Sequence, residues 1–261
     1  MATNSSDDLA PDRPTSASTA SLEAAAPPLY RAFISYSHQD EKWASWLHKA
    51  LESYRPPKRL IGQATRFGPV PRRLTPIFRD RDELASATDL GQEITAALQG
   101  SACQIVICSP AAARSHWVNE EILAYKRLGR EDRVFCLIVA GEPNASDIPG
   151  REAEECFPKA LRFCLGPDGE LSGVRAEPIA ADAREGKDGK ANAKLKILAG
   201  LLGVAFDALK QREQQRRQRR LWVLAVSAST GMAILAILTI YAFLARAEAD
   251  RQRGRAEAEA E

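Results

Sequence analysis

The sequence has little of what metal sites and disulfide frameworks are built from. Its 261 residues include three histidines, no HExxH motif, and five cysteines without a CxxC pair. This argues against a zinc enzyme and a disulfide scaffold. The 36 Lys and Arg nearly balance the 34 Asp and Glu, and a formal charge of +2 gives no overall field that favours nucleic acid. The GxGxxG, Walker A and GxSxG motifs are also missing. We expect reduced cysteines that pack in the core, no metal site and no nucleic-acid partner.

Large apolar side chains are nearly missing from residues 1–28, which are mostly Ser, Ala, Pro, Asp and Thr. Such a segment cannot bury enough surface to offset the entropy that it would lose on ordering. It also has neither the basic start nor the apolar centre of a secretory signal. We therefore expect a disordered tail at 1–28, with a cytosolic domain after it.

An uncharged run of 25 residues occupies positions 221–245 (LWVLAVSASTGMAILAILTIYAFLA). As an α-helix, it would reach roughly 37 Å at about 1.5 Å per residue, which exceeds the bilayer hydrocarbon core of about 30 Å. A buried soluble helix of this composition would need apolar partners on every side. The run therefore predicts a single transmembrane helix.

Basic residues are concentrated just before this run. Residues 210–220 hold six Lys and Arg, and residues 246–261 hold four, diluted by acids. The positive-inside rule therefore places the N-terminal part of the chain in the cytoplasm. Beside a membrane span, 210–220 is expected to contact anionic lipid headgroups, with RNA binding as the alternative. Residues 246–261 predict a charged helical stub, compatible with a longer parent chain.

Short apolar segments alternate with helical patterns between the tail and the apolar run. We predict strands at 31–36, 74–78, 104–108, 133–140 and near 178–180, and helices at 37–54, 90–98, 115–128 and 192–209. Ser37 and Asp40 predict a capping box for the first helix, and Trp43 and Trp46 fall on its core face. A loop rich in Pro, Gly and Arg fills 55–76. The alternation predicts an α/β fold with a doubly wound parallel sheet, which binds ligands at the carboxyl ends of its strands.

One acidic residue has an unusual position on the helix expected at 115–128. The arc of this helix that must face the core consists of Val118, Ile122 and Tyr125. At about 100° per residue, Glu121 lies only about 60° from Val118, on the side of Trp117, whereas Glu120 points toward water. A partly desolvated carboxylate beside an aromatic plane suits cleavage of a glycosidic bond, because positive charge develops on the sugar. The alternative is that Glu121 pairs with a Lys or Arg at the rim.

Four segments in order resemble the successive boxes of a Toll/interleukin-1 receptor (TIR) domain. These are residues 31–37 (RAFISYS), 78–84 (FRDRDEL) leading to Gly91, 108–110 (CSP) and 115–122 (SHWVNEEI). The resemblance is close over 30–141 and looser to 209. The chain as a whole resembles bacterial members of the family in which a membrane span follows the domain. The resemblance implies a flavodoxin-like sheet, a TIR domain at 29–209 and a place at the bacterial inner membrane.

The resemblance also implies an activity and a site. Many bacterial members hydrolyse NAD at the nicotinamide–ribose bond with a glutamate four residues after a tryptophan, the spacing of Trp117 and Glu121. Glu121 would then hold a ribose hydroxyl and stabilise the oxocarbenium-like transition state, while Trp117 would face the nicotinamide ring. Tyr36 and Ser37 would border the nucleotide. NAD is the substrate in this reading, and no cofactor is implied.

The segment from Asp80 and Arg81 to Gly91 matches the BB loop of the family. In the family this loop contacts a neighbouring TIR domain and helps to complete the pocket, which implies a homo-oligomer. This chain departs from the animal receptors, because 85–87 (ASA) stands where they have a proline, and the loop is longer.

Three functions are compatible with these patterns. The first is a membrane-anchored NAD hydrolase that clustering activates, in antiphage defence or stress signalling. The second is a non-catalytic adaptor that recruits other TIR domains. The third, a phosphoacceptor receiver suggested by the acids at 80–82, is disfavoured because no partner acids follow the first strand.

Overall fold

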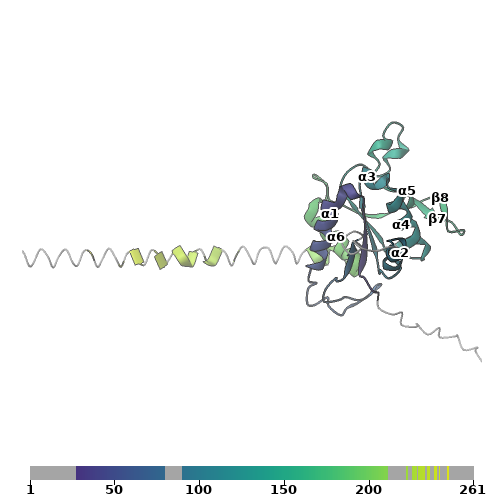
Figure 1. The fold of residues 1–261 in the computed structure, drawn as a ribbon. Coiled ribbons are helices and arrows are strands. Elements are labelled where there is room, and N and C mark those ends of the chain that lie inside the picture. Colours follow the sequence, from purple (N-terminus) through teal and green to yellow (C-terminus); the bar gives the residue numbers. More distant parts are fainter. Residues whose placement is uncertain are drawn as a thin grey trace, which may run out of the picture.

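The structure, a computed structural model, describes residues 28–79 and 90–210, together with scattered positions between 222 and 246. Parallel strands form a five-stranded sheet in the order β4-β1-β5-β6-β9 (Figure 1). They are β1 (Ala32–Ser35), β4 (Ile77–Arg79), β5 (Gln104–Cys108), β6 (Val134–Ile138) and β9 (Ile179–Asp182). The tail expected at 1–28 lies outside the described residues apart from Pro28.

Both faces of the sheet are covered, which explains why its central strands are mostly apolar. Every residue of β5 and β6 is buried. Alternate side chains of β1, β5 and β6 enter two separate hydrophobic clusters. Helices α1 (Glu41–Glu52) and α6 (Gly189–Leu202) cover one face, and α2 (Leu90–Gln99) and α4 (His116–Arg127) cover the other (Figure 1). The α/β doubly wound fold expected from the sequence is confirmed.

The order in which the chain adds strands changes direction between β1 and β5. The chain first adds β4 on one side of β1, and then adds β5, β6 and β9 on the other side. In sheets of this kind, the carboxyl ends of the two strands at the reversal flank the usual ligand crevice. The carboxyl ends of β1 and β5 therefore mark where a site is to be sought.

The predicted capping box of the first helix is wrong. The side chain of Ser37 makes no capping hydrogen bond, and a 3-10 turn, η1 (His38–Asp40), precedes α1. The carboxylate of Asp40 instead accepts a hydrogen bond from Ser109, which is distant in sequence. A local spacing rule could not anticipate this partner. Trp43 and Trp46 pack against the core as expected, with Lys190 over both rings.

Several short elements were not predicted. Within 55–76 lies a hairpin of β2 (Ala64–Thr65) and β3 (Gly68–Pro69), and a second hairpin is formed by β7 (Phe163–Leu165) and β8 (Leu171–Arg175). The other short elements are α3 (Pro110–Ala113), α5 (Lys159–Arg162), η2 (Glu131–Arg133), η3 (Ala145–Asp147) and η4 (Glu152–Glu154). Elements of two to five residues give too few positions for a periodic pattern.

The last predicted helix ends earlier than expected. Gly203, with a φ of 64°, terminates α6 at Leu202 in a left-handed cap, whereas we expected the helix to run to 209. The following chain stays on the domain, because Leu209 is buried.

Within the described residues, no helix is both long and apolar enough to cross a membrane. About half of the expected span at 221–245 lies outside those residues. The described positions in it are helical, and its large apolar side chains, such as Trp222 and Tyr241, are exposed. The hydroxyls of Ser229, Thr230 and Thr239 each donate to the carbonyl four residues earlier.

Candidate active site

The carboxyl ends of β1 and β5 bring together residues that are far apart in sequence. Tyr36, directly after β1, is 7% exposed, and Ser37 follows it half-buried in extended backbone. Ser109 follows β5 and is buried. The structure thus places Tyr36 and Ser37 at the reversal point of the sheet, where the sequence predicted a nucleotide border.

A hydrogen bond joins the chain after β1 to the chain after β5. The hydroxyl of Ser109 donates to Oδ2 of Asp40 at 2.5 Å, and the Oγ atom of Ser109 accepts a hydrogen bond from the backbone N–H of Ala112 at 3.1 Å. Burial raises the pKa of Asp40, and the hydrogen bond from Ser109 opposes this rise. Ser109 therefore joins the turn after β1 to the cap of α3, which leads directly into α4.

Helix α4 carries the candidate catalytic pair. Ser115 caps it, because its hydroxyl accepts the backbone N–H of Val118 at 3.3 Å. The predicted core arc is confirmed, since Val118, Ile122 and Tyr125 are all buried. The rotation of the helix about its axis is therefore the one that the sequence predicted.

Trp117 and Glu121 lie one turn apart on the same side of α4. The indole of Trp117 is 76% exposed, whereas Glu121 is half-buried and its Oε2 atom is shielded from solvent. Glu120, which we expected in water, is half-buried as well. The arrangement sets a carboxylate at the margin of the core beside an accessible aromatic plane.

Polar contacts fix α4 on the domain. Oδ1 of Asn119 accepts the backbone N–H of Ala160 at 2.8 Å, and the Tyr125 hydroxyl donates to the Ser101 carbonyl at 3.4 Å. Farther along, Nζ of Lys126 donates to the Phe163 carbonyl at 2.9 Å. A site carried by such a helix is held more rigidly than one on a loop.

The expected contribution of Asp80 and Arg81 lies outside the described residues. Strand β4 ends at Arg79, which is buried and pairs in register with Ile34 of β1. Because β4 and β1 are parallel, Arg79 lies at the same carboxyl edge of the sheet as Tyr36. The backbone is described again from Leu90, the first residue of α2.

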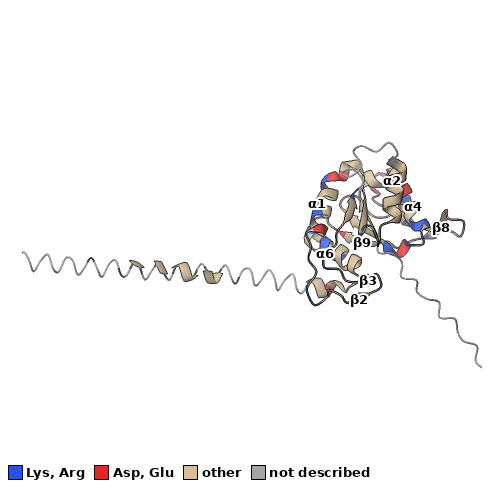
Figure 2. Ribbon diagram, turned by 60° about the horizontal axis from the view of Figure 1, so that its bottom comes forward, with Lys and Arg blue, Asp and Glu red and all other residues tan. Residues whose placement is uncertain are grey.

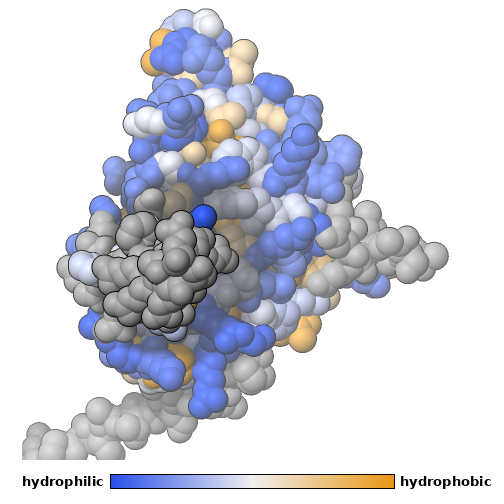
Figure 3. Space-filling model, turned by 90° about the vertical axis from the view of Figure 1, so that its left-hand side faces the viewer, coloured by the Kyte–Doolittle hydropathy of each residue, from blue (hydrophilic) through white to orange (hydrophobic). Residues whose placement is uncertain are grey.

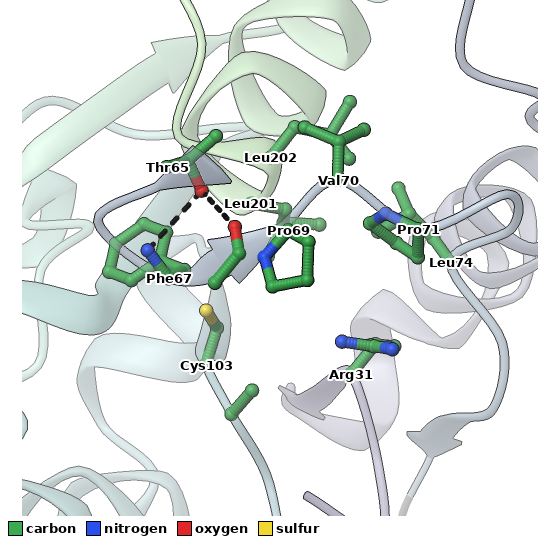
Figure 4. A pocket seen from close by; sticks show the side chains of 12 residues that line it. Arg31, Thr65, Phe67, Pro69, Val70, Pro71, Leu74, Cys103, Leu201 and Leu202 are labelled. Carbon is green, nitrogen blue, oxygen red and sulfur yellow. Dashed lines mark hydrogen bonds between the residues drawn. The ribbon is translucent and has the colours of Figure 1, made fainter. Parts of the chain in front are cut away.

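Two cavities lined by described residues lie at the opposite, amino edge of the sheet. The first holds about 20 Å³ and is lined by the β2–β3 hairpin, Arg31, Cys103 and the end of α6 (Figure 4). That volume suits about one water molecule. The second holds about 360 Å³ and lies beside Val134 and Ile179, the first residues of β6 and β9. Neither cavity is at the Trp117–Glu121 end.

The cysteines pack inside the domain. All five are free, and Cys103, Cys108, Cys136 and Cys156 are buried. Burial raises the pKa of Cys103 and of Cys156 to about 12. It also raises the pKa of Cys108, and Cys136 reinforces this rise. Such thiols are inert. Among the residues that the structure describes, no group of His, Cys, Asp or Glu could hold a metal ion.

Comparison with known proteins agrees with the fold. Residues 33–141 match the TIR-like domain of the Thoeris protein ThsB, and the five-stranded parallel sheet fits a TIR domain. The chain is also similar to the NAD(+) hydrolase ApTIR of an Actinoplanes species, with 34% identity over 188 residues. The match covers 69% of this chain but 24% of the relative, so the chain spans about a quarter of that protein's length.

Proposed function

We propose that this chain hydrolyses NAD at the nicotinamide–ribose bond, with Glu121 as its catalytic carboxylate. The observation that carries the proposal is the pairing of the half-buried Glu121 with the exposed indole of Trp117 on one face of α4. The similarity of 188 residues to a protein named an NAD(+) hydrolase supports the same chemistry.

In the proposed reaction, the bond between ribose C1′ and the nicotinamide nitrogen breaks, and nicotinamide leaves with the bonding electron pair. The ribose becomes an oxocarbenium-like cation, which water attacks to give ADP-ribose and one proton. Glu121 stabilises that cation and holds a ribose hydroxyl. A carboxylate at the core margin is effective here, because its field is less screened than it would be in water. No metal or cofactor takes part.

The remaining site residues bind the substrate in this proposal. Trp117 stacks on the nicotinamide ring, and its exposure leaves the indole face open to a ligand. Tyr36 and Ser37 border the nucleotide at the carboxyl end of β1. Asp80 and Arg81 approach from the segment after β4, which also contacts a neighbouring copy, so that the pocket is completed in a homo-oligomer.

We further propose that residues 221–245 span the bacterial inner membrane with the TIR-like domain in the cytoplasm. The uncharged length of the run supports this, and so do the hydroxyls of Ser229, Thr230 and Thr239, which are satisfied within their own helix. Anchoring concentrates the domains in one plane and favours their clustering. The cell would use this activity in signalling, such as antiphage defence.

The exposed Trp117 also suits a second candidate, a non-catalytic adaptor, because tryptophan is enriched where proteins bind one another. Release of nicotinamide separates the two functions. Full-length protein in liposomes at high protein density is incubated with NAD, and nicotinamide is measured over time. Turnover that rises with surface density supports the hydrolase, whereas no release at any density leaves the adaptor.

A further inference from the structure

The region between α1 and β4 carries basic charge without acidic residues. Residues 53–76 contain six Lys and Arg and no Asp or Glu, although the whole chain is nearly neutral. All six side chains are exposed; they are Arg55, Lys58, Arg59, Arg66, Arg72 and Arg73. We call residues 53–76 the basic loop.

The part of the domain that the structure describes offers the cations of the basic loop no carboxylate partner. Some arginines elsewhere on the surface pair with carboxylates, as Arg127 does with Glu170 and Arg151 with Glu154. Within residues 28–79 and 90–210, no ion pair involves a cation of the basic loop. The loop is therefore a surface of uncompensated positive charge.

The basic loop is fastened to the domain by its apolar residues. Leu60, Val70 and Leu74 are buried, and two backbone hydrogen bonds link Val70 to Gly62 and Gln63. Figure 4 shows Val70 and Pro69 of the loop beside Leu201 and Leu202 of α6. The apolar side chains point inward, so the loop presents its cations on a defined surface.

The basic loop lies where the chain leaves the domain. A Cβ atom built on Gly203, the cap of α6, would stand 3.0 Å from the side chain of Thr65 and 3.4 Å from that of Phe67. The hairpin therefore packs against the end of α6, and Figure 2 shows β2 and β3 on this side of the domain. Seven residues later the chain reaches Lys210, the start of the basic segment that precedes the apolar run.

We propose that the basic loop docks on anionic lipid headgroups at the membrane that anchors the chain. This inference rests on the anchoring proposed above. Charge complementarity supports it, and so does the short tether, because only residues 210–220 separate the domain from the apolar run. Figure 3 shows hydrophilic residues over most of the side of the domain from which this segment leaves, which suits contact with headgroups rather than insertion among acyl chains.

Docking would orient the candidate site. The hairpin shares a cavity with Arg31 and Cys103, which lie at the amino ends of β1 and β5. Tyr36 and Ser109 lie at the carboxyl ends of the same strands. With the amino edge on the bilayer, the carboxyl edge faces the cytoplasm and is open to NAD and to neighbouring domains.

The test uses the full chain in vesicles of phosphatidylcholine alone or in equal parts with phosphatidylglycerol. Hydrogen exchange of the amides of residues 61–68 is measured in both, for wild type, for the variant R59Q/R72Q/R73Q and for the control K42Q/K159Q/K187Q. The control removes three exposed lysines from other parts of the domain. Each cation is worth about five-fold in the docking equilibrium, so the loop variant should weaken docking about 100-fold.

We expect exchange to slow in anionic vesicles for wild type and for the control, and the loop variant and high salt to abolish this protection. If the amides of wild type exchange equally fast in neutral and in anionic vesicles, docking on lipid is wrong. It is also wrong if a poly-uridine RNA slows this exchange and anionic lipid does not. Flotation in high salt tests anchoring separately. If wild type fails to float there, anchoring is wrong; binding to anionic but not neutral vesicles at low salt would still support the docking surface.

Discussion

Trp117 and Glu121 share one face of α4, with the indole exposed to solvent and the carboxylate at the edge of the core. The two side chains differ in exposure because Glu121 lies closer than Trp117 to the buried arc of the helix that contains Val118 and Ile122. This difference suits Trp117 to binding a flat group and Glu121 to stabilising positive charge.

Trp117→Ala should weaken NAD binding without unfolding the domain. Stacking on the indole is worth about 1 kcal/mol, so KM should rise about five-fold, while an exposed substitution should change the unfolding free energy by at most about 0.5 kcal/mol. Steady-state kinetics and denaturant unfolding measure the two effects. Trp117→Phe, which keeps an aromatic ring, is the control and should recover most of the loss. An unchanged KM for Trp117→Ala would remove Trp117 from the site.

Ser109→Ala should cost more stability than Ser115→Ala. Both serines cap a helix by accepting the backbone N–H three residues on, and loss of a cap costs about 1 kcal/mol. Ser109 alone also donates to the buried Asp40, so its removal should cost about 1–2 kcal/mol more. Urea unfolding of the two variants compares these costs. Equal losses would mean that the bond from Ser109 to Asp40 contributes nothing.

Asp40 predicts a distinctive dependence of stability on pH. Because burial raises its pKa, the folded protein binds this proton more tightly than the unfolded chain does. The resulting stability is present in acid and is lost as pH rises through the raised pKa. The unfolding free energy of wild type minus that of Asp40→Asn should therefore fall as pH rises above about 4. The exposed Asp207→Asn variant is the control, and a flat difference for Asp40→Asn would contradict the account.

Gly200→Ala should destabilise the domain although alanine favours helices. A Cβ atom at this position would lie 2.6 Å from the ring of Phe135 in β6, and such overpacking costs about 1–3 kcal/mol. At Gly91, in the first turn of α2, a Cβ atom meets nothing within 4 Å. Gly91→Ala should therefore be neutral or stabilising, and thermal unfolding distinguishes the pair. A stable Gly200→Ala variant would show that α6 packs differently on the sheet.

The sequence predicted the sheet and its helices because their patterns are long or fully apolar. Strands such as β6 are apolar throughout, and the spacing of Val118, Ile122 and Tyr125 set the rotation of α4 correctly. The β2–β3 hairpin and the bond from Ser109 to Asp40 could not be predicted. The first is too short for a periodic signal, and the second joins residues that only the folded sheet brings together. The roles of Asp80 and Arg81 stay predictions.

Nicotinamide release by Glu121→Gln and Glu120→Gln tests the central claim most directly. Both substitutions remove one charge from adjacent, half-buried glutamates of the same helix turn, so that charge and helix propensity are matched. With wild type and both variants at equal density in liposomes, Glu121→Gln should lose about 100-fold or more of the rate, because it removes the group that stabilises the ribose cation. Glu120→Gln should retain most of it. Equal rates for wild type and Glu121→Gln, or a loss confined to Glu120→Gln, would contradict the assignment of Glu121 as the catalytic carboxylate.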